Sequence, residues 1–157
     1  MFEVKMVITR FVNELKPDVI QQYLMSAGAV LGLALSIMLG GIDKMIWALF
    51  GLAVVDYALG TAGAFKSGIW DSSTGYWGIV KKSSMFAFVG IAVAVDYAVG
   101  TDQTLRQIVI GAYGVNEAGS ILENIDKLGF SNLIPASIRN GLSRAKDDSD
   151  AGKKVKF

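Results

Sequence analysis

Apolar residues in this chain are concentrated in three long runs that short polar segments separate. The runs cover residues 23–41, 45–64 and 83–100, and each contains at most one charged residue. A helix needs about 20 mostly apolar residues to cross the ~30 Å hydrocarbon core of a bilayer. The pattern therefore predicts an all-α integral membrane protein with these runs as transmembrane helices.

A fourth segment, 105–125, has the length of a span but carries several polar residues. Its polar and large residues recur every three or four positions and so share one helix face: Arg106, Ile110, Tyr113, Glu117, Ser120 and Asn124, with Asn116 and Glu123 beside this stripe. Facing lipid, such a stripe would be prohibitive, whereas facing protein or water it is acceptable. Two arrangements follow: four spans, or three spans with 105–125 on the membrane surface.

Basic residues favour the four-span arrangement. Lysine and arginine accumulate on the cytoplasmic side of membrane proteins, and this chain has one cluster at Lys66, Lys81 and Lys82 and a second in the tail 126–157. Two crossings must separate clusters that lie on the same side. We expect Lys81 and Lys82 in a cytoplasmic loop, and both termini in the cytoplasm.

The two ends of the chain are more polar than the centre. Residues 1–22 alternate charged and apolar positions at helical spacing, which predicts an amphipathic helix. This helix would lie on the membrane surface or pack on the protein. The tail 126–157 predicts a short helix to about residue 145, followed by a charged, disordered end.

One sequence motif occurs twice in the apolar runs, each time with an aspartate. Residues 55–61 read VDYALGT and residues 95–101 read VDYAVGT. Asp56 lies about 16 Å along its helix from Met45, near the bilayer midplane, whereas Asp96 lies nearer an end. Intramembrane acids indicate functional sites; the structural alternative is a buried Asp56 hydrogen-bonded to Tyr97 or Asn116.

Small residues at intervals of four predict two smooth helix faces. Such faces let helices approach closely in lipid. The first comprises Gly28, Gly32, Ser36 and Gly40, and the second Gly90, Ala94 and Ala98.

Composition narrows the possible chemistry. Charged residues make up 18% and apolar residues 52% of the chain, and Cys and His are both absent. These absences exclude thiol nucleophiles, His catalysis, and Cys or His metal ligands. A net charge of +1 does not favour a nucleic-acid partner. We expect no enzymatic activity and no cofactor.

Four stretches in this order resemble a known family: VVDYALGTAGAF, KSGIW…GYWGIVKKSSM, VAVDYAVG and NEAGSILENIDKLG. The chain resembles phage holins of the clostridial toxin-secretion and phage-lysis type. The resemblance singles out the following residues: Asp56, Tyr57, Gly60, Lys82, Asn116, Glu117, Ser120, Glu123 and Asn124. It covers about residues 27–145, and the extension 1–22 and the second DYAxGT motif depart from the family pattern.

The resemblance implies a protein that forms homo-oligomers in the cytoplasmic membrane of a bacterial host. It would open holes that release an endolysin or a toxin, without needing direct contact with the endolysin. The alternative from the residues themselves is a small ion or proton channel or transporter that uses Asp56 and Glu117 as a relay.

Because the chain has no cysteine, single cysteines can test its topology. We predict that Asp102→Cys reacts with an impermeant thiol reagent added outside cells, while Thr74→Cys and Ser149→Cys do not. External labelling at position 74 or 149 would rule out four spans with cytoplasmic termini.

Overall fold

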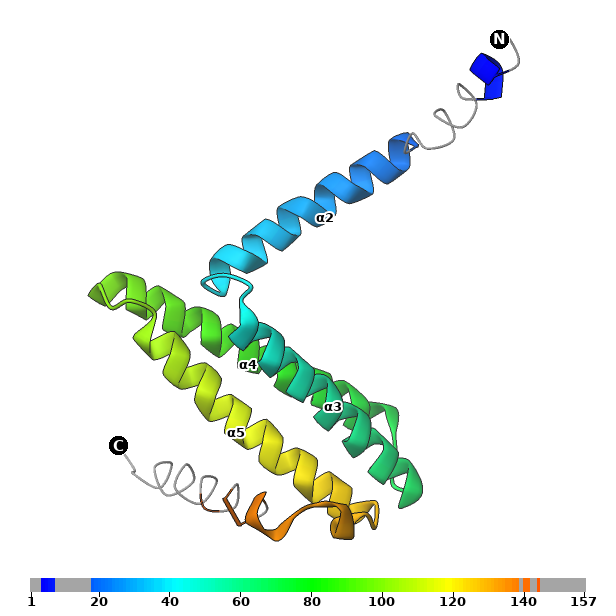
Figure 1. Cartoon of the computed structure of the whole chain (residues 1–157), viewed down its shortest axis with the longest axis vertical. Helices are drawn as coiled ribbons and strands as arrows, with labels where there is room; N and C mark the ends of the chain where they lie inside the picture. Colours follow the sequence, from blue (N-terminus) through cyan, green and yellow to red (C-terminus); the bar gives the residue numbers. More distant parts are fainter. Residues whose placement is uncertain (1–3, 8–17, 139, 142–143, 145–157) are drawn as a thin grey trace. The chain divides into compact units, whose positions relative to one another are not determined.

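The computed structural model describes residues 4–7, 18–138, 140–141 and 144 (Figure 1). The chain divides into two units, Met1–Ile37 and Met38–Phe157. Most of the amphipathic helix predicted at 1–22, and half of the tail 126–157, lie outside the described residues. Residues 4–7 are helical.

The helix α2, Val19–Met38, is the first of the predicted spans and contains no buried residue. It begins four residues earlier and ends three residues earlier than the predicted span 23–41. A Cβ added at Gly28 or Gly32 would meet no atom within 4 Å. Gly40 lies beyond the helix end, so its predicted place on a helix-packing face is wrong.

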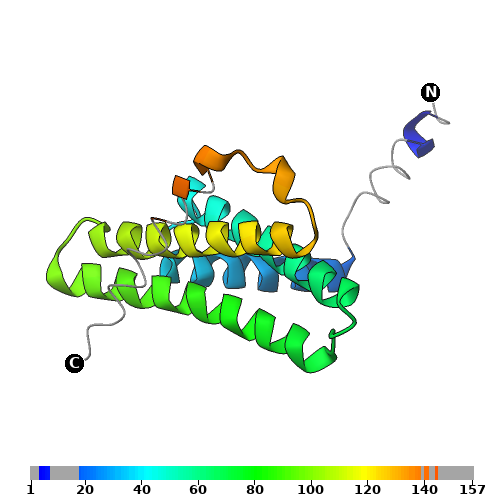
Figure 2. The same ribbon diagram turned by 90° about the horizontal axis from the view of Figure 1, so that it is seen from below.

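Three further helices lie side by side in the second unit (Figures 1 and 2). They are α3 (Lys44–Lys66), α4 (Ser72–Val99) and α5 (Thr104–Lys127). A short 3-10 turn, Ser131–Leu133, follows. The described residues are in helices and turns, which confirms the all-α prediction. Helices α2, α3 and α4 are long and apolar enough to cross a membrane.

The third apolar helix is longer than the sequence pattern predicted. Helix α4 begins at Ser72 rather than at residue 83. The Asp71 carboxylate caps it by accepting a hydrogen bond from the Thr74 amide at 2.6 Å, and this bond lowers the pKa of Asp71. The prediction that Lys81 and Lys82 lie in a loop is therefore wrong, because both belong to α4.

Each helix of the second unit turns one seam towards its neighbours, with positions spaced alternately three and four residues apart. This spacing gives the 3.5-residue repeat of helices that pack at a shallow angle. The seam of α5 is the predicted polar stripe, and Arg106, Ile110 and Glu117 on it are buried. The other seams comprise Ile46, Leu49, Ala53, Asp56, Gly60 and Gly63 on α3, and Gly75, Gly78, Lys82, Met85, Val89, Ala92 and Asp96 on α4.

The packing along these seams is asymmetric. On one side of Asp56 the seams carry large side chains, and Ile46, Leu49, Val89 and Ile110 form a buried core. On the other side the seams of α3 and α4 carry glycines. Large apolar side chains therefore fill one half of the bundle, and the other half is packed less densely.

The turn between α2 and α3 requires a glycine at position 40. Gly40 has φ +70°, and a Cβ there would lie 3.0 Å from both Arg106 Cδ and Val93 Cγ2. The left-handed region costs an L-residue roughly 1–2 kcal/mol. The turn, and the arginine packed beneath it, therefore depend on this residue.

We predict that Gly40→Ala lowers the unfolding free energy in detergent by about 1–2 kcal/mol from the backbone alone. The control is Gly111→Ala on α5, where an added Cβ meets nothing within 4 Å. Denaturant titration followed by circular dichroism measures both. Equal stability of the two variants would contradict the role of Gly40.

Candidate functional site

One charged residue from each helix meets in the interior of the second unit. The Lys82 ammonium of α4 donates a hydrogen bond to Asp56 Oδ2 of α3 at 2.7 Å and is also ion-paired with Glu117 Oε2 of α5. We call Asp56, Lys82 and Glu117 the ionic layer. The side chains of Lys82 and Asp56 are 15% exposed and that of Glu117 is 5% exposed.

The three residues meet because each occupies a seam position of its own helix. Removing one partner of a buried ion pair leaves an uncompensated charge, which costs roughly 3–5 kcal/mol. Two carboxylates face one ammonium here. The amide of Asn124 donates a further hydrogen bond to Asp56 Oδ1 at 2.9 Å.

The partners of Asp56 differ from those that the sequence suggested. Tyr97 is 91% exposed on α4, and Asn116 is half-buried one position before Glu117. Asp56 is instead bound by Lys82 and Asn124. Lys82 was named in a basic cluster and by the family resemblance, and it was expected in a loop and not as a partner of Asp56.

The two remaining predicted site residues of α5, Ser120 and Glu123, differ in how exposed they are. Ser120 is half-buried on the seam between Glu117 and Asn124, whereas Glu123 is exposed. The seam spacing thus separates the residues that face the helices from those that do not.

Tyr57 and Gly60 shape the space next to the ionic layer. The Tyr57 ring packs so closely on α4 that a Cβ at Gly78 would lie 3.1 Å from Tyr57 Cε2. The Tyr57 hydroxyl donates to the Gly75 carbonyl at 3.4 Å. Gly60 faces Asn124, where an added Cβ would lie 3.3 Å from the amide nitrogen.

A cavity of about 250 Å³ lies beside these contacts, on the glycine side of the ionic layer. Asp56 and Lys82 reach it from one end and Trp70 and Thr74 from the other. Its full lining is Asp56, Tyr57, Gly60, Thr61, Ala64, Trp70, Thr74, Gly75, Gly78, Lys81, Lys82 and Asn124.

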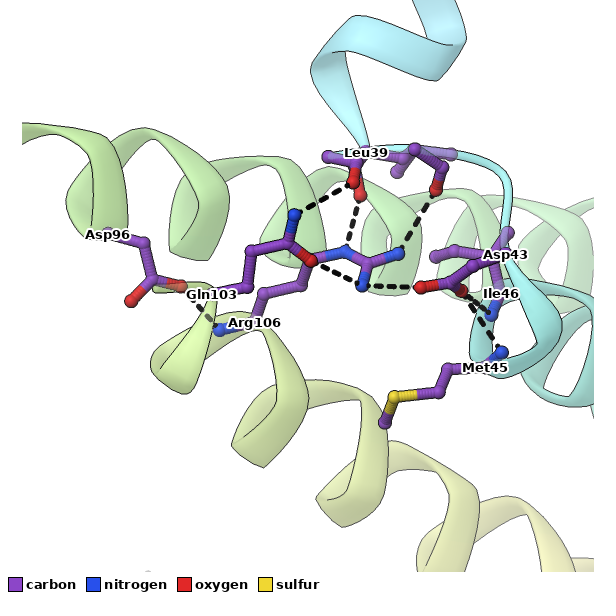
Figure 3. Close-up of polar contacts among 9 residues, drawn as sticks. Leu39, Asp43, Met45, Ile46, Asp96, Gln103 and Arg106 are labelled. Carbon is purple, nitrogen blue, oxygen red and sulfur yellow. Dashed lines mark hydrogen bonds and ion pairs between the residues drawn. The ribbon is translucent and has the colours of Figure 1, made fainter. Parts of the chain in front are cut away.

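At the opposite end of the unit, Arg106 is buried to 1% exposure and ties two turns together (Figure 3). Its guanidinium donates to the backbone carbonyls of Leu39 at 2.6 Å and Gly41 at 3.0 Å. It also binds Asp43 Oδ2 at 2.8 Å and Gln103 Oε1 at 3.1 Å. A single side chain thereby satisfies four acceptors from the α2–α3 and α4–α5 turns.

Asp43 serves this cluster and α3 at once. Its other oxygen accepts from the Met45 and Ile46 amides, both at 3.0 Å, which caps α3. The hydrogen bond from Arg106, helped by these amides, lowers the pKa of Asp43 to about 2. The cap and the ion pair therefore stay formed at any physiological pH.

Asp96 has a different role from Asp56, although the same motif surrounds both. Asp96 is 3% exposed at the end of α4 and accepts from the amides of Leu105 at 3.0 Å and Arg106 at 2.8 Å. Thr101 also donates to it. It therefore caps α5 from the preceding helix. Asp96 lies near the end of its helix, as the sequence indicated.

The second small-residue face is mostly directed away from the neighbouring helices. Ala94 and Ala98 are exposed, and only Gly90 is half-buried, with an added Cβ 3.4 Å from the Met38 carbonyl oxygen. The described residues contain no group of three acidic side chains placed to hold a metal ion.

Comparison with known proteins identifies a matching family and several relatives. The sequence model of the bacteriophage holin family matches residues 33–147. Uncharacterized proteins of Listeria innocua and Listeria monocytogenes are each 34% identical over 72% of this chain and 76% of their own. One from Halalkalibacterium halodurans is 30% identical over 78% of this chain and 93% of its own. No solved structure matches.

We predict that Lys82→Met destabilises the bundle by about 3–5 kcal/mol, because it leaves two carboxylates without their ammonium. The control is Lys81→Met, the same change at the adjacent, exposed lysine, which we expect to stay within about 0.5 kcal/mol of the parent. Unfolding in mixed micelles measures both. Equal effects of the two substitutions would mean that the ionic layer does not stabilise the fold.

Proposed function

Because this chain belongs to the bacteriophage holin family, we propose that it forms homo-oligomers in the bacterial cytoplasmic membrane and opens holes that release an endolysin. Toxin release is the same process with another cargo. The observation that carries the proposal is the ionic layer. In a chain of a membrane-protein family, it is a set of charges at a depth where lipid would not solvate them.

The positions of aromatic residues support insertion of α3 and α4 across a bilayer. Tryptophan and tyrosine favour the membrane–water interfaces. On α4, Trp77 and Tyr97 are exposed and twenty residues apart, which corresponds to about 30 Å of helix, the thickness of the hydrocarbon core. On α3, Trp47 is exposed near the start of the helix.

We also propose that α5 crosses the membrane as a fourth span. Hydropathy alone does not select it, because its polar stripe lowers its average. Two contacts hold it parallel to α3 along the whole length of that helix: Arg106 with Asp43 at the starts of the two helices, and the Leu128 carbonyl with the Lys66 ammonium, at 2.7 Å, at their ends.

Pairing within the bundle answers the objection that two of the charges in α5 raise. Both are buried, and Arg106 is ion-paired with Asp43 and Glu117 with Lys82. The exposed positions in the middle of α5 are instead apolar or small, namely Ile108, Gly111 and Ala112. A helix with this outer surface is compatible with lipid on its free side.

In this proposal the ionic layer keeps the resting subunit closed. Its charges satisfy one another while α3, α4 and α5 are packed, so the subunit presents an apolar surface to lipid. When subunits assemble and helices separate, the same charges need water, and they become the lining of a hole. The smooth faces at Gly28, Gly32 and Ser36, and at Gly90, Ala94 and Ala98, are the proposed association surfaces.

Co-expression with a cytoplasmic endolysin that lacks a secretion signal tests the function. We expect abrupt lysis after a delay only when both proteins are present. Expression of either protein alone is the control. Accumulation of the chain in the membrane without lysis of the co-expressing cells would rule out holin activity.

The ionic layer also supports a second candidate, an ion or proton channel that uses the buried carboxylates as a relay. Such a channel gives a selective, saturable conductance and passes no folded enzyme. Release of the cytoplasmic endolysin therefore distinguishes the holin from the channel.

We predict that Asp56→Asn changes the time of lysis in the co-expression assay, because it removes one carboxylate from the layer that keeps the helices together. Asp102→Asn is the matched control: the same acid-to-amide change in the exposed α4–α5 turn, with no expected effect. Immunoblots of membranes check that both accumulate. Unchanged timing for Asp56→Asn would separate the ionic layer from hole opening.

A further inference from the structure

The cavity beside the ionic layer has features that membrane helices do not need for packing alone. Four glycines, Gly60, Gly63, Gly75 and Gly78, lie on the seams of α3 and α4 over this half of the bundle. The Tyr57 ring fills part of the space that they leave. The remaining cavity is lined in part by charged and hydroxyl groups, including Lys81, Thr61 and Thr74.

We propose that this cavity is a water-filled vestibule that enters the bundle from the α3–α4 end and stops at the ionic layer. A polar cavity holds water when it has room and hydrogen-bonding partners, and one water requires about 10–15 Å³ of such volume. The cavity has about 250 Å³, room for several waters. Water there solvates Lys82 and Asp56, which are the more exposed members of the layer.

The depth of the vestibule follows from helix geometry. Asp56 lies nine residues before Phe65, or about 14 Å along α3. This is about half of the ~30 Å hydrocarbon core. Water therefore reaches the bilayer midplane from one side while the bundle is closed.

The other half of the bundle blocks the path. Beyond the ionic layer the seams are filled by side chains such as Leu49 and Val89, which are 1% and 0% exposed. Arg106 then binds the two turns at the far end. In this proposal the ionic layer is hydrated through the vestibule, and the apolar half of the bundle closes the path beyond it.

The vestibule proposal rests on the placement of α3, α4 and α5 in the bilayer that is proposed above. It does not rest on hole formation. Thr61 lines the cavity, whereas its neighbour Ala62 is exposed on the outer surface of α3. Ala62 is one residue closer to the membrane surface, so depth alone would make it the more accessible of the two.

Cysteine accessibility tests the vestibule in membranes from cells that express the full chain. We expect a charged, impermeant methanethiosulfonate reagent to modify Thr61→Cys at least about tenfold faster than Ala62→Cys. We expect no modification of Ala53→Cys, which lies in the apolar half and is 4% exposed in the parent. The reagent is added separately to intact cells and to inverted vesicles.

Cysteines at two exposed positions identify the two sides of the membrane. Ser73→Cys marks the side of the α3–α4 end of the bundle, and Asp102→Cys marks the side of the opposite end. Thr61→Cys must react only from the side that labels Ser73→Cys. A rate no faster than that of Ala62→Cys, or reaction from the other side, would overturn the vestibule, and modification of Ala53→Cys would overturn the closure by the apolar half. The marker positions test the bilayer placement separately, and lysis by the same variants reports hole formation independently.

Discussion

The structure depends on one constraint: a charge buried between the helices must find its partner within the protein. Helix α5 brings Glu117 and Arg106 into the interior of the bundle, and α3 and α4 supply Asp56, Lys82 and the Asp43 turn as counterparts. A polar helix thereby becomes compatible with two apolar ones. The arrangement of all three helices follows from satisfying these charges together, with the apolar core filling the space between them.

The sequence predicted the parts of the fold that depend on periodicity. The apolar runs located α2, α3 and the second half of α4, and the three–four spacing from Arg106 to Asn124 correctly selected the inward face of α5. These features are local, because hydropathy and helical spacing can be judged one segment at a time. Whether α5 crosses the bilayer is not a local property, since it depends on which of its charges are paired.

The sequence analysis missed what depends on contacts between helices. Lys82 was assigned to a loop because the segment before the third apolar run is polar and basic, yet its glycines Gly75 and Gly78 continue the seam that leads to Met85 and Val89. That spacing was the available signal. The repeated DYAxGT motif misled in another way. In α3 the chain remains helical through Gly60, whereas α4 ends before Gly100, which has φ +80°. The same motif therefore makes an interior contact in one copy and ends a helix in the other.

The origin of the ionic layer in three successive helices also has a consequence for biogenesis. Chains fold from the N-terminus as they are synthesised, so α3 and α4 emerge before α5. At this layer the α3–α4 hairpin is already neutral, because Asp56 and Lys82 balance each other. Helix α5 is synthesised last and finds a prepared site for Glu117. The order of the helices along the chain therefore allows Asp56 and Lys82 to pair before Glu117 joins them.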